Sequence, residues 1–152
     1  MVLSAGIPAP EFELADETGA LRRLYDFRGV PVVLYFYPKD DTPGCTTEAC
    51  AFRDDYDEYT QAGVTILCVS PDTKNSHAKF KAKYNLPFSL LADTDHAVCE
   101  AYGVWGRKKY MGREYDGVFR TTFLIGADGM ILKVFENVKP DGHSQEILAG
   151  LK

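Results

Sequence analysis

Two cysteines, Cys45 and Cys50, lie close enough in the sequence to act together in thiol chemistry. Cys50 follows Cys45 with four residues between them, within the run Pro38–Cys50. The thiolate is the nucleophilic form of cysteine, and a second thiol nearby can trap its oxidised form as a disulfide. The pattern therefore indicates a nucleophilic cysteine that has its own disulfide partner.

The segments around Cys45 predict how that sulfur is positioned. Residues Val30–Tyr37 are apolar and rich in β-branched and aromatic side chains, as in a buried central strand, and Pro38 ends the run. Thr42 has the character of a helix N-cap, and Pro43 suits the first helical position. Cys45 then falls in the first turn, where unpaired N–H groups and the helix dipole favour the thiolate.

The same loop carries a family pattern. Pro38, Thr42 and Cys45 fit Pro-x-x-x-Thr-x-x-Cys, and the segment resembles a peroxiredoxin of the bacterioferritin-comigratory-protein or Q-type subfamily. Further stretches resemble that subfamily along nearly the whole chain: Asp26–Gly29, Thr42–Cys45, Tyr102–Gly106 and Phe119–Ile125. The resemblance implies a thiol peroxidase on a thioredoxin-like fold, in which Cys45 attacks the O–O bond of hydrogen peroxide or an organic hydroperoxide.

The resemblance also implies roles for other residues. Thr42 matches the hydroxyl that hydrogen-bonds peroxide and thiolate, Pro38 the residue that shields the pocket, and Arg120 the catalytic arginine. A guanidinium beside a thiolate would favour the charged sulfur and present donors to the peroxide oxygens. Glu48, three residues after Cys45, matches an acidic position in related proteins, but dipole compensation in a first helical turn explains it equally well.

Cys50 is the expected resolving cysteine, which would trap the sulfenic acid of Cys45 as an intramolecular disulfide. In a helix, residues five apart have α-carbons roughly 8.7 Å apart and point about 140° away from each other. A disulfide needs α-carbons within about 7 Å. If both cysteines are helical in the reduced protein, the first turn or two must therefore unwind before the bond closes.

The other two cysteines have weaker claims to redox chemistry. Cys68 lies inside an apolar run, so we expect an inert core thiol. Some relatives place a resolving cysteine on a helix in the second half of the chain, at a position near Lys81 to Tyr84, where this sequence has none. Cys50 is thus the better candidate, and Cys99 is a minor alternative.

No metal or other cofactor is expected. The cysteines form no compact ligand quartet of the kind that binds zinc. His77, His96 and His143 are scattered, and no two of them have metal-ligand spacing, so we expect solvated surface histidines.

Composition limits the partners and the compartment. The net charge of −5 disfavours nucleic acid and anionic membranes, and the short basic cluster Arg107–Lys109 is interpreted as a solvated loop. Residues Met1–Gly6 lack both a cationic leader and a long apolar core, so we expect no secretory signal and a cytoplasmic location. The resemblance implies a monomer that is recycled by thioredoxin, with glutaredoxin as a substitute.

We expect one α/β domain over residues 1–152, with a thioredoxin-like fold whose central mixed β-sheet is flanked by helices. Residues 103–117 look like a loop that could also pair as a ribbon, and Gly126–Gly129 is a hairpin turn signal. After the central strand, helical and strand-like runs alternate: helices over 43–61, 75–84, 97–102 and 144–151, and strands over 64–70, 89–91, 121–125 and 130–136.

Two other classes of protein share this architecture. A thioredoxin-like disulfide reductase ordinarily carries Cys-x-x-Cys, whereas four residues separate Cys45 from Cys50, and Thr42 would have no role in it. A non-catalytic binding module would leave the intact set Pro38, Thr42, Cys45 and Arg120 unexplained. Reduction of insulin without peroxide turnover would favour the reductase.

Overall fold

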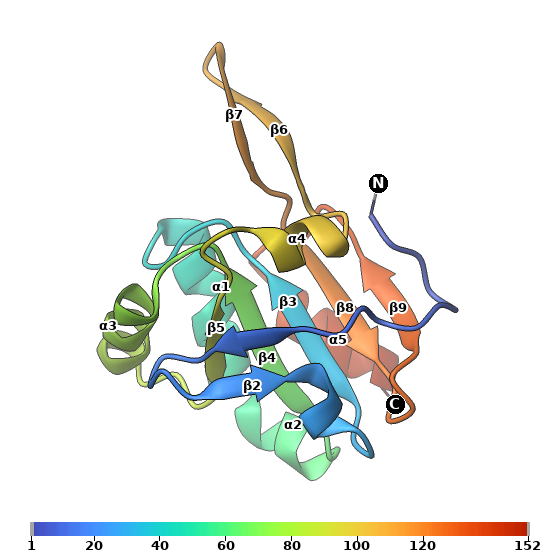
Figure 1. Cartoon of the computed structure of the whole chain (residues 1–152). Coiled ribbons are helices and arrows are strands. Elements are labelled where there is room, and N and C mark those ends of the chain that lie inside the picture. Colours follow the sequence, from blue (N-terminus) through green and yellow to red (C-terminus); the bar gives the residue numbers. More distant parts are fainter. Residues whose placement is uncertain (1, 152) are drawn as a thin grey trace.

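The computed structural model describes residues 2–151 of the chain (Figure 1). Its strands and helices alternate over much of the sequence, as expected. In chain order they are β1 (Glu13–Ala15), β2 (Leu21–Arg23), the 3₁₀ helix η1 (Leu24–Phe27), β3 (Val32–Phe36), α1 (Pro43–Asp54), α2 (Tyr56–Gln61), β4 (Thr65–Ser70), α3 (Lys74–Tyr84), β5 (Ser89–Ala92), α4 (Ala97–Ala101), β6 (Trp105–Tyr110), β7 (Arg113–Val118), β8 (Thr121–Ile125), β9 (Ile131–Phe135) and α5 (His143–Leu151).

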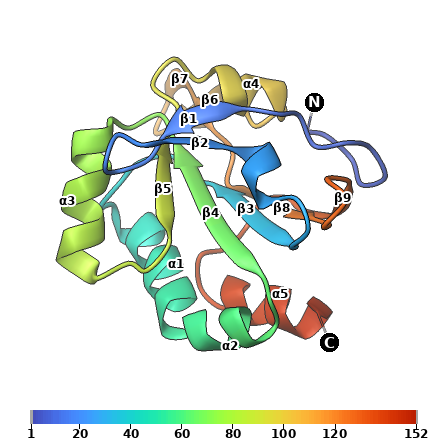
Figure 2. The ribbon, with the colours of Figure 1, turned by 60° about the horizontal axis from the view of Figure 1, so that its bottom comes forward.

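A seven-stranded mixed sheet forms the centre of the molecule, in the order β2-β1-β5-β4-β3-β8-β9. Strands β3, β4 and β5 are parallel, whereas β8 runs antiparallel to β3 and β9 antiparallel to β8. Figure 2 shows α1, α2 and α5 below this sheet and α4 above it. The expected thioredoxin-like α/β fold is confirmed.

Strand β3 divides the core into two layers, because successive side chains of a strand point to opposite faces. Its even-numbered residues, Val32 to Phe36, join one buried cluster with Tyr102, the C-cap residue of α4. Its odd-numbered residues join a second cluster that contains Cys45 and Phe52 of α1. The nucleophile candidate therefore lies on the face of the sheet that α1 covers.

The predicted elements after β3 are all present, one helix in two parts, and three short elements before β3 were not expected. The helix expected over 43–61 is interrupted at Asp55, which ends α1 and begins α2. The strands β1 and β2 and the helix η1 were not predicted, because segments of three or four residues are too short to show a periodicity. No helix among residues 2–151 is both long and apolar enough to span a membrane.

Residues 103–117 form a ribbon rather than a loop, so the second of the two interpretations is correct. Strands β6 and β7 pair antiparallel and stand away from the body of the molecule (Figure 1). Met111 and Gly112 have φ values of 50° and 79°, as a tight hairpin turn between right-twisted strands requires. The cluster Arg107–Lys109 is therefore part of a strand, and Lys108 is half-buried while its two neighbours are exposed.

Candidate active site

Cys45 lies in the first turn of α1, as predicted. Thr42 is the N-cap residue and Pro43 begins the helix. The Cys45 side chain is 1% exposed and packs among the residues of the second core cluster. A sulfur at this position is shielded from bulk water, so charged groups that contact it act with little screening.

Arg120 reaches Cys45 because of the pairing between two strands. Phe36, the last residue of β3, is opposite Thr121, the first residue of β8. Arg120 precedes β8, so it lies beside the end of β3, where the loop to α1 begins. Its Nη2 atom donates a hydrogen bond to Cys45 Sγ at 3.3 Å, and its Nη1 atom donates one to Glu48 Oε1 at 2.8 Å.

Glu48 is thus a partner of Arg120, and the expectation that it lies in the first turn of α1 as a compensating charge for the helix dipole is wrong, because it is the sixth residue of that helix. Its side chain is 1% exposed, and its Oε2 atom has no hydrogen-bond partner among the described residues. Burial raises the pKa of Glu48 to about 7, although Arg120 acts in the opposite direction. Burial opposes the charge of Arg120, yet Glu48 and Cys45 raise the pKa of this guanidinium above its ordinary value.

Gly44 provides the space for this arrangement. A Cβ atom at this position would lie 3.2 Å from Arg120 Nη2 and 3.4 Å from a carbon of Pro140. These are tight contacts, so a larger residue would press on the guanidinium that touches Cys45. Sequence reasoning used this glycine only as part of the stretch Thr42–Cys45 and assigned it no role of its own.

The other two predicted site residues lie in the loop before α1. The Oγ1 atom of Thr42 donates a hydrogen bond to the carbonyl of Lys39 at 3.0 Å and does not cap the first turn. Pro38 is half-buried at the end of β3. The Thr42 hydroxyl bonds Lys39 rather than Cys45, and the Pro38 ring has no donor or acceptor, so their roles toward peroxide stay predictions.

The four thiols are free and occupy different environments. Cys50 is half-buried on α1, the same helix as Cys45. Cys68 is buried in β4, and burial raises its pKa well above the ordinary value, as expected for an inert core thiol. Cys99 is also fully buried, and burial likewise raises its pKa. Of the three other thiols, Cys50 is the most accessible.

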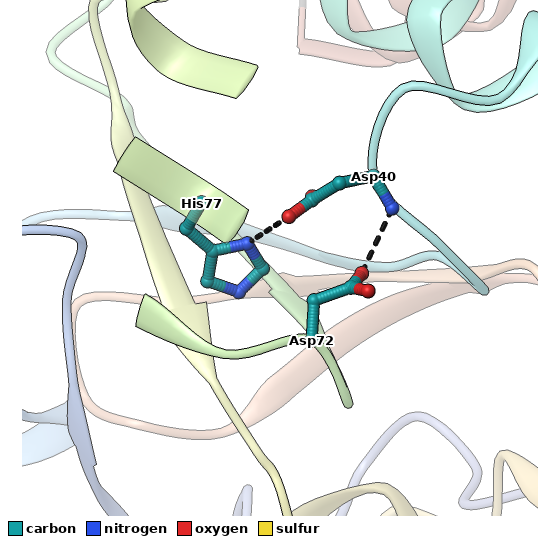
Figure 3. Close-up of side chains that lie close together, drawn as sticks. All are labelled: Asp40, Asp72 and His77. Atoms are coloured by element: carbon teal, nitrogen blue, oxygen red, sulfur yellow. Dashed lines mark hydrogen bonds and ion pairs between the residues drawn. The ribbon is translucent and has the colours of Figure 1, made fainter. Parts of the chain in front are cut away.

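A buried polar cluster fixes the loop that carries Pro38 and Thr42 (Figure 3). His77 of α3 contacts Asp40 in that loop, with 2.7 Å between Nδ1 and Oδ2, and its Nε2 atom donates to the carbonyl of Leu91 at 2.9 Å. Asp40 also accepts a hydrogen bond from Ser76, and its backbone N–H donates to Asp72. Sequence reasoning missed this cluster, which has no local signature.

The next residue of the loop is also held by α3. Asp41 has a left-handed backbone with φ of 55°, which is uncommon for a residue other than glycine. Its carboxylate accepts hydrogen bonds from Lys83 at 2.7 Å and from Tyr84 at 2.8 Å. The loop that leads to Cys45 is therefore attached to α3 at two consecutive residues.

The expectation that all three histidines are solvated is wrong. His77 and His143 are buried, and the buried ring of His143 hydrogen-bonds Thr122. Only His96 is partly exposed, and its ring stacks on Trp105. The ligand-type atoms of Asp40, Asp72 and His77 lie within 4.8 Å of one another, but hydrogen bonds within the cluster already occupy the atoms that face each other.

The fold and the contact between a buried cysteine and an arginine define a thiol-based enzyme of thioredoxin-like architecture. Comparison with known families agrees: the AhpC/TSA family model matches residues 5–134. The chain belongs to this family.

Curated relatives make the assignment narrower. The chain is 50% identical over 151 residues to a putative peroxiredoxin Bcp of Coxiella burnetii, covering 99% of this chain and 100% of the relative. It is 47% identical over 152 residues to peroxiredoxin Bcp of Bacillus subtilis, covering 100% and 97%. These relatives identify the protein as a peroxiredoxin, an enzyme that reduces peroxides with a cysteine thiol.

Solved structures agree with the fold. A structure of the Xanthomonas campestris bacterioferritin comigratory protein, studied for its alkyl peroxide reduction activity, has a TM-score of 0.90 at 37% identity, covering 97% of this chain and 96% of that one. A Xylella fastidiosa PrxQ mutant has a TM-score of 0.92 at 33% identity, covering 99% and 96%.

Proposed function

We propose that Cys45 is the peroxidatic cysteine of this peroxiredoxin and that Arg120 and Thr42 assist it. The observation that carries the proposal is the 3.3 Å hydrogen bond from Arg120 to the Cys45 sulfur. A guanidinium in contact with sulfur stabilises the thiolate, and its remaining donors suit oxygen atoms on which charge develops. Pro38 limits access to the sulfur from the loop side.

The first step forms one bond and breaks another. The Cys45 thiolate attacks one oxygen of the hydroperoxide, so that an S–O bond forms while the O–O bond breaks. The leaving hydroxide or alkoxide takes up a proton and departs as water or alcohol. Sulfur loses two electrons to the peroxide and becomes a sulfenic acid.

Cys50 is the proposed resolving cysteine. Its thiolate attacks the sulfenic sulfur of Cys45, so that the S–S bond forms while the S–O bond breaks, and the hydroxide that leaves takes up a proton to become water. Because both residues lie on α1, the geometry of a helix keeps their α-carbons about 8.7 Å apart until the first turns unwind. The enzyme would therefore alternate between a folded form that is ready for peroxide and a locally unfolded disulfide form.

An external dithiol must then reduce the disulfide. We propose thioredoxin for this step, with glutaredoxin as a substitute, in the cytoplasm, where thiols are kept reduced. The enzyme would work as a single-domain monomer, which light scattering of the reduced protein can test. Turnover supported by thioredoxin and its reductase, but not by a monothiol, would agree with the proposed donor.

Stopped-flow mixing of reduced protein with peroxide tests the assignment of the cysteines. Cys45→Ser should abolish the fast reaction, whereas Cys50→Ser should keep the first oxidation and lose the disulfide, as read by mass spectrometry of linked peptides. Cys68→Ala, at a buried thiol, is the matched control and should behave as the wild type. A fast reaction in Cys45→Ser would refute the proposal, and insulin reduction without peroxide turnover would favour a disulfide reductase.

A further inference from the structure

The β6–β7 ribbon projects from the end of the sheet at which α1 begins. Strand β8 starts beside the end of β3, and β7 ends at Val118, three residues before β8. The ribbon is therefore attached next to Arg120, whose guanidinium contacts Cys45. It forms a two-stranded sheet of its own and stands clear of the body (Figure 1).

One face of the ribbon has balanced charges. Alternate residues of a strand point to opposite faces of a sheet, and residues that are paired across two strands share a face. Arg107 forms an ion pair with Asp116 at 3.4 Å, and Lys109 is opposite Glu114 on the same face. Each positive charge of this face thus has a carboxylate across from it.

The other face has cations and exposed aromatic rings without carboxylates across from them, and we call its residues Lys108, Tyr110, Arg113 and Tyr115 the cationic face. Tyr110 is opposite Arg113, and Lys108 is opposite Tyr115. Tyr110 is 67% exposed and Tyr115 is 45% exposed. Because tyrosine and arginine are enriched in protein interfaces, this face has the composition of a docking surface.

The cationic face continues to the active site over two paired glycines. A Cβ at Gly117 would lie 3.3 Å from Cε2 of Tyr115, so this ring lies over the glycine. A Cβ at Gly106 would lie 2.8 Å from a ring carbon of Phe119, so a second ring covers the other glycine. Phe119 is half-buried and directly precedes Arg120. A partner that lies along the cationic face therefore reaches the segment that carries the arginine of the site.

The ribbon is basic although the chain is acidic. Residues 105–118 contain four basic and two acidic residues and thus have a net charge of +2. The whole chain has a net charge of −5, so the rest of it has a net charge of −7. An acidic partner is repelled by this body and attracted by the ribbon, so that electrostatic steering brings it to the ribbon first.

We propose that the cationic face is the docking surface for the protein that reduces the oxidised enzyme, and that this reductant has an acidic surface beside its dithiol. The inference rests on the proposed function, in which an external dithiol reduces the disulfide between Cys45 and Cys50. A ribbon that is paired only with itself is stabilised by such a contact, since an isolated hairpin is marginally stable in water.

Two electrons pass from the reductant to the enzyme in this exchange. One thiolate of the reductant attacks a sulfur of the enzyme disulfide, so that a mixed disulfide forms and the released sulfur takes up a proton. The second thiolate of the reductant then breaks the mixed disulfide. The reductant leaves with its own disulfide, and both cysteines of the enzyme are thiols again.

A nucleic acid fits the ribbon less well than an acidic protein does. The cationic face has two cations, whereas binding through a phosphate backbone draws on more contacts, on the order of 6 to 10 for a DNA-binding protein with strong salt dependence. A long polyanion would also meet the acidic body. A protein needs only an acidic patch as large as the ribbon.

Charge reversals on the two faces separate docking from net charge. Arg113→Glu changes the cationic face and Lys109→Glu the opposite face, at exposed residues, and each changes the net charge by the same amount. Tyr110→Ala removes an exposed ring and leaves the charge unchanged. Circular dichroism and the stopped-flow rate constant of Cys45 with peroxide verify the fold and the site of each variant.

Steady-state turnover of hydrogen peroxide is measured with an acidic thioredoxin, its reductase and NADPH, and separately with dithiothreitol. For Arg113→Glu, we expect the KM for thioredoxin to rise about tenfold, and for Tyr110→Ala about threefold, with kcat little changed. Lys109→Glu should stay within about twofold of the wild type. Dithiothreitol is too small to use a docking surface, so all four proteins should turn over alike with it.

Equal KM values for Arg113→Glu and Lys109→Glu would overturn the inference, because only the net charge would then matter. A wild type that dithiothreitol reduces but the acidic thioredoxin does not would overturn it as well. Binding of a single-stranded oligonucleotide by the wild type, with loss in Arg113→Glu, would assign the cationic face to nucleic acid instead. The proposed function fails separately, if Cys45→Ser still reacts with peroxide.

Discussion

Replacement of Glu48 by glutamine should change how the stability of the folded protein depends on pH. Glu48 is buried on α1, and its Oε1 atom accepts a hydrogen bond from Arg120. Burial raises the pKa of its carboxyl from 4.5 to about 7 in the folded state. Glutamine has nearly the same shape and can accept the same hydrogen bond, but it does not titrate.

The sign and size of the effect follow from proton linkage. Between the two pKa values, the unfolded chain has released the Glu48 proton while the folded protein still holds it, so stability falls as pH rises. The whole contribution is about 3 kcal/mol, because the pKa rises from 4.5 to about 7 and each pKa unit corresponds to roughly 1.4 kcal/mol. Most of it, roughly 2 to 3 kcal/mol, is lost between about pH 5 and pH 8. Above the folded pKa the contribution no longer changes.

Urea unfolding of the reduced protein, followed by far-ultraviolet circular dichroism at a series of pH values, measures this. Groups away from Glu48 titrate alike in wild type and Glu48→Gln, so the difference between the two profiles reports Glu48 together with its contact to Arg120. The wild type should lose roughly 2 to 3 kcal/mol more than the variant between about pH 5 and pH 8. Glu58→Gln, which removes an exposed carboxylate from α2, is the control and should follow the wild type. Parallel profiles for wild type and Glu48→Gln would refute the reasoning.

Two further substitutions test the packing that supports the site. His77→Leu leaves the buried Asp40 carboxylate without its ring partner and should lower the free energy of unfolding by about 3 to 5 kcal/mol in urea titrations. Adding Asp40→Ala should restore part of that stability, and a purely additive loss would contradict this. Tyr59→Phe removes the donor to the Ser144 carbonyl between α2 and α5 and should cost about 1 to 3 kcal/mol by thermal unfolding, whereas a variant as stable as the wild type would count against that bond.

The parts of the site that the sequence predicts are those with local causes. A proline after a threonine defines the start of α1, and three residues of helix then place Cys45 in the first turn. The apolar run before Pro38 predicts β3, since a buried strand has a short uninterrupted hydrophobic pattern. This signal is also local in the sequence.

The parts that the sequence does not reveal depend on long-range pairing. Arg120 meets Cys45 through the register of β3 against β8, and only the family resemblance suggested it. The spacing of Glu48 places it on the same helical face as Cys45 but does not say what covers that face. His77 is an isolated histidine in the sequence, and its partner Asp40 is 37 positions away.

The β6–β7 ribbon is a second part of the structure that the sequence does not predict unambiguously. Polar and apolar residues do not alternate regularly along residues 105–118, so the sequence there does not distinguish a strand from a loop. The sequence alone therefore does not distinguish Lys108 from Arg107 and Lys109. In the structure, Lys108 is half-buried and the other two are exposed.

If Cys45 and Cys50 form the proposed disulfide, the attachment of Asp40 and Asp41 to α3 would determine where order is lost. Four hydrogen bonds from α3 keep those two residues in place, so unwinding would begin at Thr42. Ordering a residue again costs roughly 1 to 2 kcal/mol of backbone entropy, and a short segment with one end already fixed has few conformations to search. Recovery of the helix after each reduction would then be a local event, which lets one catalytic cycle follow another without disturbing the sheet.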